Sequence, residues 1–205
     1  STQGYSSAAS DVYKRQPDAF APGYGLSECV CIATLASGEF RSVEIDREGY
    51  AKGRFAPVPS DGKAIVGVGR VPSGMRIVAV RADGSPCGPD EIGEICLSGE
   101  NVCGGYWKNP EETKRFEAEI PGYPGRFYRT GDMGALYGGQ LYLTGRIKEM
   151  IVVSGKNIYP SDITLLLHEQ GLAPAVDAVG VFSVESEGGE RPVLCAECGL
   201  SLIHI

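Results

Sequence analysis

Histidine is nearly absent from this chain of 205 residues, which contains only His168 and His204. Two histidines exclude a histidine-rich metal site and a catalytic triad built on histidine. Basic residues are fewer than acidic ones, 19 Lys and Arg against 26 Asp and Glu, so the formal net charge is -7. A nucleic-acid-binding surface needs an excess of Lys and Arg on one face. Nucleic acid is therefore not an expected partner.

Long hydrophobic runs and paired cysteines are lacking as well. No run approaches the roughly 18 apolar residues of a membrane span, and no N-terminal stretch has the pattern of a secretory signal. The seven cysteines are an odd number without paired spacing, which is typical of reduced thiols in the cytoplasm and not of a disulfide framework. With 42% apolar and 22% charged residues, the chain can bury a core. We expect a folded cytoplasmic protein without a membrane span.

The two ends of the chain encode one another's complement. Asp11–Gln16 can be back-translated as GATGTGTATAAGAGACAG, and the reverse complement of this string, read in frame, gives Leu200–Ile205. The string resembles the transposon end that is used to build sequencing libraries. We therefore expect residues 1–16 and 200–205 to be remnants of a sequencing adapter and leave them out of the fold. The alternative is a pair of ordinary termini.

Turn residues divide the rest of the sequence into short strands and two helices. Met75–Arg81 and Ile92–Leu97 are expected strands, with a turn at Asp83-Gly84 between them. Gly138-Gly139 predicts a hairpin that joins Leu136-Tyr137 to Gln140–Leu143. The first helix should begin after a cap at Asn109 and end before Pro121.

Beyond Lys148 the pattern changes. Glu149–Val153 is an expected strand, and Ser161 can cap a helix that ends near Gln170. Two further strands are expected over 176–184 and 192–198. This order predicts a β-rich body followed by a unit that begins like a βαβ motif.

A ring, a hydroxyl and a carboxylate follow a glycine turn at residues 24–28, Tyr-Gly-Leu-Ser-Glu. Such a set can stack on a flat base, bind a phosphate and hold Mg²⁺ through one carboxylate. The alternative is a buried tyrosine followed by a surface glutamate.

Two later motifs carry charges that suit a nucleotide. Asp132 follows a turn at Gly131, where its carboxylate can accept both hydroxyls of a ribose, although an Asx turn would use the same residues. Arg146 and Lys148 are two positions apart in an extended segment and so point the same way. They suit a phosphate clamp or, alternatively, a solvated pair at a domain edge.

In this order the three motifs resemble the adenylate-forming superfamily, which comprises acyl-CoA synthetases, nonribosomal-peptide adenylation domains, luciferases and fatty acyl-AMP ligases. Gly104–Thr113 and Lys148–Ile163 support the resemblance, and Val43–Arg47 and Asn157–Ile163 are most similar to fatty acyl-AMP ligases. Those ligases activate fatty acids for the acyl carrier proteins of polyketide or lipopeptide synthases.

The resemblance implies an incomplete α+β fold. Residues 17–147 would form the C-terminal part of an AMP-binding large domain, with a β-rich, distorted barrel-like subdomain. Residues 148–199 would begin a small α/β C-terminal lid domain, with Lys148 at the hinge.

The resemblance also implies an ATP- and AMP-binding set made of Tyr24, Gly25, Ser27, Asp132 and Arg146. In this set Tyr24 stacks on adenine, Ser27 contacts the α-phosphate, Asp132 holds the ribose hydroxyls and Arg146 reaches ribose or phosphate.

Two further roles follow from the resemblance. Glu28 would coordinate Mg²⁺. Gly23 and Gly25 would line the acyl pocket, because the missing side chains leave room for substrate.

The implied reaction activates a fatty acid with ATP and Mg²⁺ as acyl-AMP and passes the acyl group to the thiol of an acyl carrier protein. Coenzyme A is the alternative acceptor, as in a fatty acyl-CoA ligase. The family's phosphate loop and catalytic lysine are not found in the sequence, and no Gly-x-x-x-x-Gly-Lys-Ser/Thr loop replaces them. No catalytic residue is therefore assigned, and the chain alone is expected to be inactive.

Two other interpretations remain beside the ligase. Cys195-Ala-Glu-Cys198 could be half of a zinc site or a redox pair, but Cys29 and Cys31 have the wrong spacing for a second pair. Strand alternation makes Cys195 an expected inward core residue instead. The other interpretation is a non-catalytic β-rich binding module whose site residues are structural turns.

Overall fold

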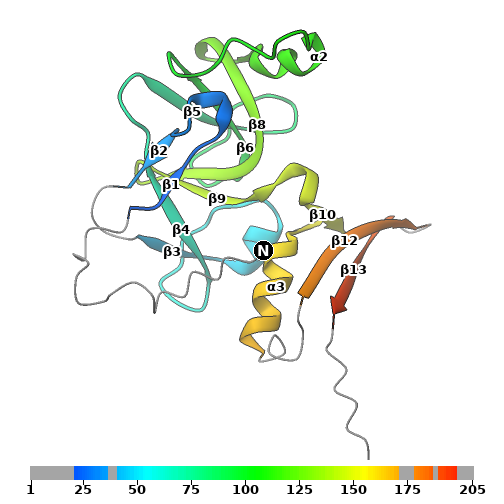
Figure 1. Cartoon of the computed structure of the whole chain (residues 1–205). Coiled ribbons are helices and arrows are strands. Elements are labelled where there is room, and N and C mark those ends of the chain that lie inside the picture. Colours follow the sequence, from blue (N-terminus) through cyan, green and yellow to red (C-terminus); the bar gives the residue numbers. More distant parts are fainter. Residues whose placement is uncertain (1–20, 37–40, 171–177, 187–188, 198–205) are drawn as a thin grey trace, which may run out of the picture.

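The computed structural model describes residues 21–36, 41–170, 178–186 and 189–197. Its body is an antiparallel sheet of nine strands in the order β1-β2-β4-β9-β8-β6-β5, with β3 added to β4 and β7 added to β8 (Figure 1). The strands are β1 Gly23–Tyr24, β2 Thr34–Leu35, β3 Ser42–Ile45, β4 Lys63–Arg70, β5 Met75–Val80, β6 Gly93–Gly99, β7 Ala118–Ile120, β8 Tyr123–Tyr137 and β9 Gln140–Arg146. The expected β-rich fold is confirmed.

The centre of the sheet is buried on both faces. Successive residues of a strand point to opposite faces, and in β6 the side chains of Ile95 and Leu97 enter one apolar cluster while Cys96 enters another. β5 repeats this division, with Ile77 on the first side and Val78 on the other. A third cluster, around Ile45, Phe55 and Tyr142, lies under β3 and β4. The strands predicted at 75–81 and 92–97 are thus confirmed as β5, at the edge of the sheet, and its inner neighbour β6.

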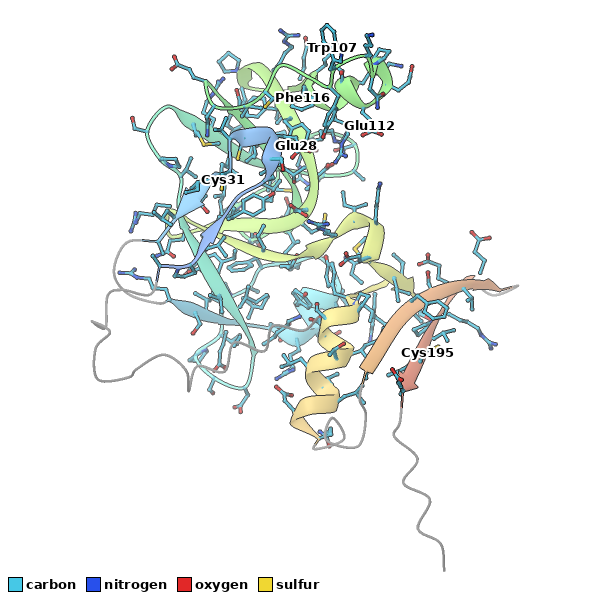
Figure 2. The ribbon with its side chains drawn as sticks, viewed as in Figure 1. Glu28, Cys31, Trp107, Glu112, Phe116 and Cys195 are labelled. Carbon is cyan, nitrogen blue, oxygen red and sulfur yellow. The ribbon has the colours of Figure 1, made fainter. Side chains whose placement is uncertain are left out.

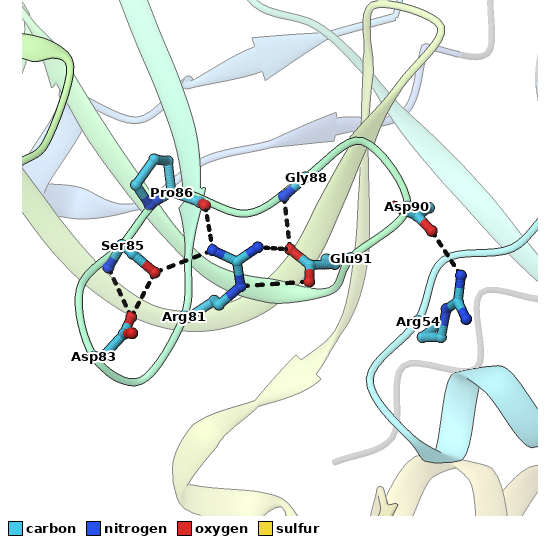
Figure 3. Close-up of polar contacts among 8 residues, drawn as sticks. All are labelled: Arg54, Arg81, Asp83, Ser85, Pro86, Gly88, Asp90 and Glu91. Atoms are coloured by element: carbon cyan, nitrogen blue, oxygen red, sulfur yellow. Dashed lines mark hydrogen bonds and ion pairs between the residues drawn. The ribbon is translucent and has the colours of Figure 1, made fainter.

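Ion pairs hold the loop between β5 and β6 (Figure 3). Gly84 has φ +84° and Asp83 Oδ1 accepts from the Ser85 N–H at 2.9 Å, which confirms the expected turn. Arg81 pairs with Glu91, whose Oε2 also accepts from the Gly88 N–H at 2.7 Å. The loop is therefore tied at both ends and in its middle.

The hairpin of β8 and β9 brings residues 132 and 146 together. Gly138 and Gly139 have φ +56° and +76° and form the predicted two-residue turn. From the turn the pairing runs regularly to Gly134 and Leu143, and then Thr144 is skipped, so that Asp132 faces Arg146 directly. An extra residue in one strand is a β-bulge, and it exchanges the two faces of that strand beyond it. Without the bulge Asp132 would face Gly145.

The first predicted helix is much shorter than expected. Asn109 does cap it, since its Oδ1 accepts from the Glu112 N–H at 3.2 Å, but α2 spans only Pro110–Thr113. The chain then forms a 3₁₀ turn, η4, at Lys114–Phe116 and enters strand β7. Phe116 is buried against Tyr128, with ring centroids 4.4 Å apart. The prediction of one helix to Pro121 is wrong because burial of this ring and pairing of β7 with β8 outweigh local helix propensity.

After β9 come η5 at Ile147–Glu149, a hairpin of β10 Ile151–Val153 and β11 Lys156–Ile158, helix α3 Pro160–Glu169, and a hairpin of β12 Ala178–Ser186 and β13 Gly189–Glu197. Helix α3 starts one residue before Ser161, so Ser161 is not its cap. A βαβ unit needs a parallel pair, whereas the strand pairs in the described ranges are all antiparallel, so that expectation is wrong for these residues. Residues 176–177 and 198 of the expected strands lie outside the described residues.

Lys63 of β4 ties helix α3 to the body. Its ammonium pairs with Asp162, and these two side chains are only 15% and 25% exposed. The same ammonium lies 3.9 Å from the centroid of the Tyr50 ring, in helix α1 (Arg47–Ala51). Burial lowers the pKa of Lys63, and Asp162 opposes that shift.

Lys63→Met should loosen α3 selectively. The change leaves Asp162 without its cationic partner in a half-buried place, at a cost of about 1–2 kcal/mol after allowance for partial exposure. Hydrogen exchange should become faster in α3 amides and stay unchanged in β8 and β9. Lys52→Met is the matched control, because the Lys52–Glu48 pair is 55% and 72% exposed and contributes little. Equal acceleration in both variants would contradict a special role for Lys63.

No helix in the described part of the chain is long and apolar enough to span a membrane.

Candidate nucleotide-binding site

One pocket of about 250 Å³ collects residues from distant parts of the chain. Its walls come from η3 (Ser27–Cys29), η4, β8, the end of β9 and η5. Glu28, Asp132 and Arg146 all line it, so the three charged residues expected around one cleft do meet there. Three larger hollows in the described part of the chain, of about 480, 580 and 550 Å³, contain none of these three residues.

Asp132 is the buried centre of this pocket, with 9% of its surface exposed. The Tyr24 hydroxyl donates to its Oδ2 at 2.6 Å, and Arg146 Nε donates to its Oδ1 at 3.0 Å. Both partners are far from Asp132 in sequence, so its carboxylate does not form the alternative Asx turn. Each carboxylate oxygen has a second lone pair. The oxygens therefore retain acceptor capacity toward the pocket.

Tyr24 holds Asp132 from inside the core. Its side chain is 8% exposed and belongs to the apolar cluster of β5 and β6. Burial, followed by the hydrogen bond to Asp132, raises the pKa of Tyr24, which therefore stays a neutral donor. A ring so covered has little free face to stack on a base, so the structure gives no support to the adenine-stacking role, which remains a prediction.

The backbone before Asp132 makes a tight turn. Gly131 has φ +78°, in the left-handed region. Thr130 Oγ1 accepts from the Asp132 N–H at 3.0 Å and donates to the Ile95 carbonyl at 2.8 Å. The turn is thereby fastened to β6, and Asp132 is directed to the pocket.

Glu28 also lines the pocket, from η3, and lies in the upper part of the body near Phe116 (Figure 2). Its carboxylate accepts a hydrogen bond from the Tyr106 hydroxyl. This bond is the main reason why the pKa of Glu28 lies below its ordinary value; partial burial acts in the opposite direction. Glu28 is therefore held as an anion that faces the pocket.

Tyr106→Phe should raise the pKa of Glu28 toward its ordinary value. A carboxyl group whose pKa is lowered on folding stabilises the fold above its unfolded pKa of about 4.3, and this contribution disappears as the pH falls through the folded pKa. The variant should therefore lose less stability on acidification below pH ~4.3 than the parent. Carboxyl-carbon NMR titration of Glu28 measures the shift. Tyr123→Phe, a change at an exposed ring, is the control, and an equal titration shift in both variants would contradict the account.

The donor set fits magnesium held mainly by its substrate. Mg²⁺ is commonly bound by one or two carboxylates together with substrate phosphates, and Glu28 offers one carboxylate. The described residues contain no group of three or more His, Cys, Asp or Glu side chains that could hold a metal by themselves. Cys198, half of the zinc alternative, lies outside the described residues. The expectation that Cys195 points inward is wrong, because it is exposed opposite Gly180, which has no side chain to cover it.

Gly23 and Gly25 have the protein's own backbone where a side chain would point. A Cβ on Gly25 would lie 1.5 Å from the Cys31 carbonyl oxygen, and one on Gly23 would lie 2.9 Å from the Thr34 carbonyl oxygen. The reason given for the acyl pocket, that the missing side chains leave room, is therefore wrong, because backbone occupies the positions where these side chains would lie. The pocket-lining role itself remains a prediction. These glycines allow the segment after η3 to fold back against the segment before it.

Of two other residues that the sequence predicted for the site, one lines the pocket and one does not. Ser27 is exposed and does not line the pocket. Lys148 does line it, from η5, in addition to its predicted position at a hinge.

Sequence reasoning did not identify two pocket-side residues. Tyr106 binds Glu28, and Arg115 lines the pocket and lies over the Tyr128 ring at 5.5 Å. For Tyr106 the available signal was the stretch 104–113, which supported the family resemblance without giving any one residue a role. Arg115 lies outside that stretch.

The pocket residues occur in a chain with clear relatives. Residues 5–107 match the family described as AMP-binding enzyme. A 4-hydroxyphenylalkanoate adenylyltransferase of Mycobacterium marinum is 40% identical over 163 residues, which cover 74% of this chain and 26% of that protein. The medium-chain-fatty-acid–[acyl-carrier-protein] ligase JamA of Moorena producens is 34% identical over 190 residues, which cover 88% of this chain and 32% of that protein.

Solved structures agree with these sequence matches. A structure from a study of fatty acyl-adenylate ligases of E. coli and L. pneumophila superposes with a TM-score of 0.75 at 25% identity, covering 91% of this chain and 33% of that chain. The chain thus spans about a quarter to a third of the length of these relatives.

Proposed function

The chain belongs to the family of AMP-binding enzymes, and we propose that it is part of a ligase that activates a fatty acid as acyl-AMP for an acyl carrier protein. The pocket between Glu28, Asp132 and Arg146 would bind the AMP portion. The observation that carries the proposal is the buried Asp132 carboxylate, which is held by Tyr24 and Arg146 and keeps acceptor capacity toward the pocket.

The chemistry of the pocket supports a ribose site. A carboxylate can accept both hydroxyls of a ribose, and hydrogen bonds to a charged acceptor are worth roughly 1.5–3 kcal/mol each. Arg146 is 67% exposed at its side chain, so its guanidinium is accessible to a phosphate while Nε holds Asp132. The local cations Arg146 and Lys148 offset the repulsion of ATP by a chain of net charge -7.

Magnesium would be held by Glu28 together with the phosphates, and when bound it neutralises charge on them. The protein's own residues position the nucleotide, because catalysis of acyl adenylation depends largely on orientation and charge neutralisation. Residues 17–147 would belong to the large domain and residues 148–199 to the lid, which would turn about Lys148 between the two reaction steps. Such closure completes many active sites.

The names of the relatives define the acid and the acceptor to be tested. The acyl-carrier-protein ligase supports transfer to a carrier, and a cytoplasmic polyketide pathway is the proposed setting. The 4-hydroxyphenylalkanoate adenylyltransferase makes an aryl-alkanoic acid a second candidate substrate.

The proposal is tested with a full-length ligase that contains this chain. Fatty acids of several lengths and a 4-hydroxyphenylalkanoic acid are offered with ATP, and pyrophosphate exchange is measured. Acyl transfer is then assayed with a phosphopantetheinylated carrier protein and with coenzyme A. We expect exchange with fatty acids and transfer to the carrier. Efficient acyl-CoA formation would contradict the proposed acceptor, and no exchange with any of these acids would contradict the proposed function.

A further inference from the structure

The turn that carries Asp132 bulges away from the neighbouring strand. β6 and β8 pair at Cys96 with Arg129 and again at Glu94 with Met133, so two residue steps on β6 correspond to four on β8. The regular pairing of β6 with β8 therefore does not hold residues 130–132, which lie between these two pairs. Other contacts must fix the direction in which Asp132 points.

Arg115 supplies contacts on one side of the bulge. It lies in η4, and its Nη2 donates to the carbonyl oxygens of Arg129 at 3.1 Å and Thr130 at 3.0 Å. Its Nη1 lies 3.6 Å from a carboxylate oxygen of Glu112, and its side chain is 34% exposed. A planar guanidinium can bridge two acceptors in this way, which the single ammonium of lysine does less well.

Glu94 supplies contacts on the other side. It is 6% exposed, its Oε1 accepts from the Gly131 N–H at 3.1 Å, and its Oε2 accepts from Arg129 Nε at 2.8 Å. Unlike Arg115, Glu94 does not line the pocket. Together the two side chains bind the two consecutive peptide groups that join residues 129–131, just before Asp132.

We propose that Arg115 and Glu94 are positioning residues, which hold the bulged turn so that the Asp132 carboxylate meets the ribose hydroxyls. The inference rests on the proposed function, because it needs Asp132 to bind a ribose. It adds two residues that act through the backbone of residues 129–131.

The test compares AMP with 2′,3′-dideoxy-AMP, which lacks both ribose hydroxyls. A cation that merely attracts phosphate changes the affinity for both ligands equally, whereas a residue that positions Asp132 changes their ratio. Dissociation constants are measured by NMR titration of this chain. We expect the unaltered chain to prefer AMP by about 100-fold, because the dideoxy ligand lacks both of the hydrogen bonds that the ribose hydroxyls would donate to the charged Asp132.

Arg115→Ala should reduce that preference to less than about threefold, and Arg115→Lys should restore it only in part. Glu94→Gln keeps an acceptor for Gly131 but removes the charge that faces Arg129, so an intermediate ratio is expected. Lys114→Ala is the matched control, since Lys114 is the neighbouring residue and pairs only with exposed Glu111 in the contacts described. It should leave the ratio unchanged.

The outcomes separate the two proposals. No preference for AMP in the unaltered chain would contradict the ribose role of Asp132 and with it the proposed function. A preference that survives both Arg115→Ala and Glu94→Gln would contradict positioning alone, as would an equal loss in Lys114→Ala. If Glu94→Gln does not fold, the half-exposed Arg115 variants still decide the question.

Discussion

Asp132→Ala should reduce pyrophosphate exchange by about 100-fold in a full-length ligase that contains this chain, while the protein remains folded. The change would remove the charged acceptor of two hydrogen bonds that the ribose hydroxyls donate, each worth at least roughly 1.5 kcal/mol, and a factor of ten corresponds to about 1.4 kcal/mol. It also leaves the Tyr24 hydroxyl without its acceptor in the core. Exchange kinetics and a thermal unfolding curve together measure both effects.

A double variant separates binding from stability. Asp132→Ala leaves the Tyr24 hydroxyl without its acceptor, and Tyr24→Phe removes that hydroxyl. The double variant should therefore recover part of the lost stability and none of the lost exchange. Arg70→Ala serves as a control, because Arg70 is at the far end of β4 and does not line the pocket. If Asp132→Ala leaves exchange unchanged, the ribose role is wrong.

Gly25→Ala should destabilise the fold by about 3 kcal/mol or more. The added Cβ would lie 1.5 Å from the Cys31 carbonyl oxygen and 2.7 Å from its carbonyl carbon. These are backbone atoms, so no side-chain rotation can relieve the overlap, and overpacking of this kind typically costs 1–3 kcal/mol or more. The segment that must move carries Glu28, so the magnesium-side wall of the pocket should be displaced as well. Urea unfolding measures the loss of stability.

Gly104→Ala is the matched control for this change. A Cβ at Gly104 would meet no atom within 4 Å, so its effect should stay within about 0.5 kcal/mol, as for most surface substitutions. Cross-peaks of residues 27–32 should shift in Gly25→Ala and stay in place in Gly104→Ala. A Gly25→Ala protein as stable as Gly104→Ala would show that residues 25 and 31 do not lie this close.

The β8–β9 hairpin shows both the reach and the limit of sequence reasoning. Gly138-Gly139 predicts its turn because few other residues adopt two consecutive positive φ angles. A regular hairpin from that turn would pair Asp132 with Gly145 and send the Arg146 side chain to the other face. The bulge at Thr144 shifts the register by one residue, so that Asp132 pairs with Arg146. No local residue preference predicts this bulge. That Asp132 and Arg146 share one cleft was therefore expected from the family resemblance and not from strand geometry, and their direct contact was not predicted.

The groups that contact the site residues from distant parts of the sequence were also not predicted. The order of the motifs indicated that Glu28, Asp132 and Arg146 share a cleft, but it did not indicate which groups bind them. Tyr106 is 78 residues from Glu28 in sequence, and Arg115 acts on backbone carbonyls, which carry no sequence signal.

The predicted length of helix α2 was wrong for a related reason. Its cap at Asn109 is a local interaction and was predicted, whereas its early end depends on the burial of Phe116 against a ring of β8. Local propensity describes the start of this helix, and tertiary packing determines its length.

An AMP titration of this chain, followed residue by residue by NMR, tests the central claim most directly. We predict that the largest shifts occur at Glu28, Gly131, Asp132 and Arg146, and that Asp132→Ala abolishes them. The hollow between α1 and α3, near Lys63 and Leu166, is larger and provides the internal comparison. Shifts centred on that hollow, or no saturable shifts at all, would contradict the assignment of the nucleotide to the pocket around Asp132.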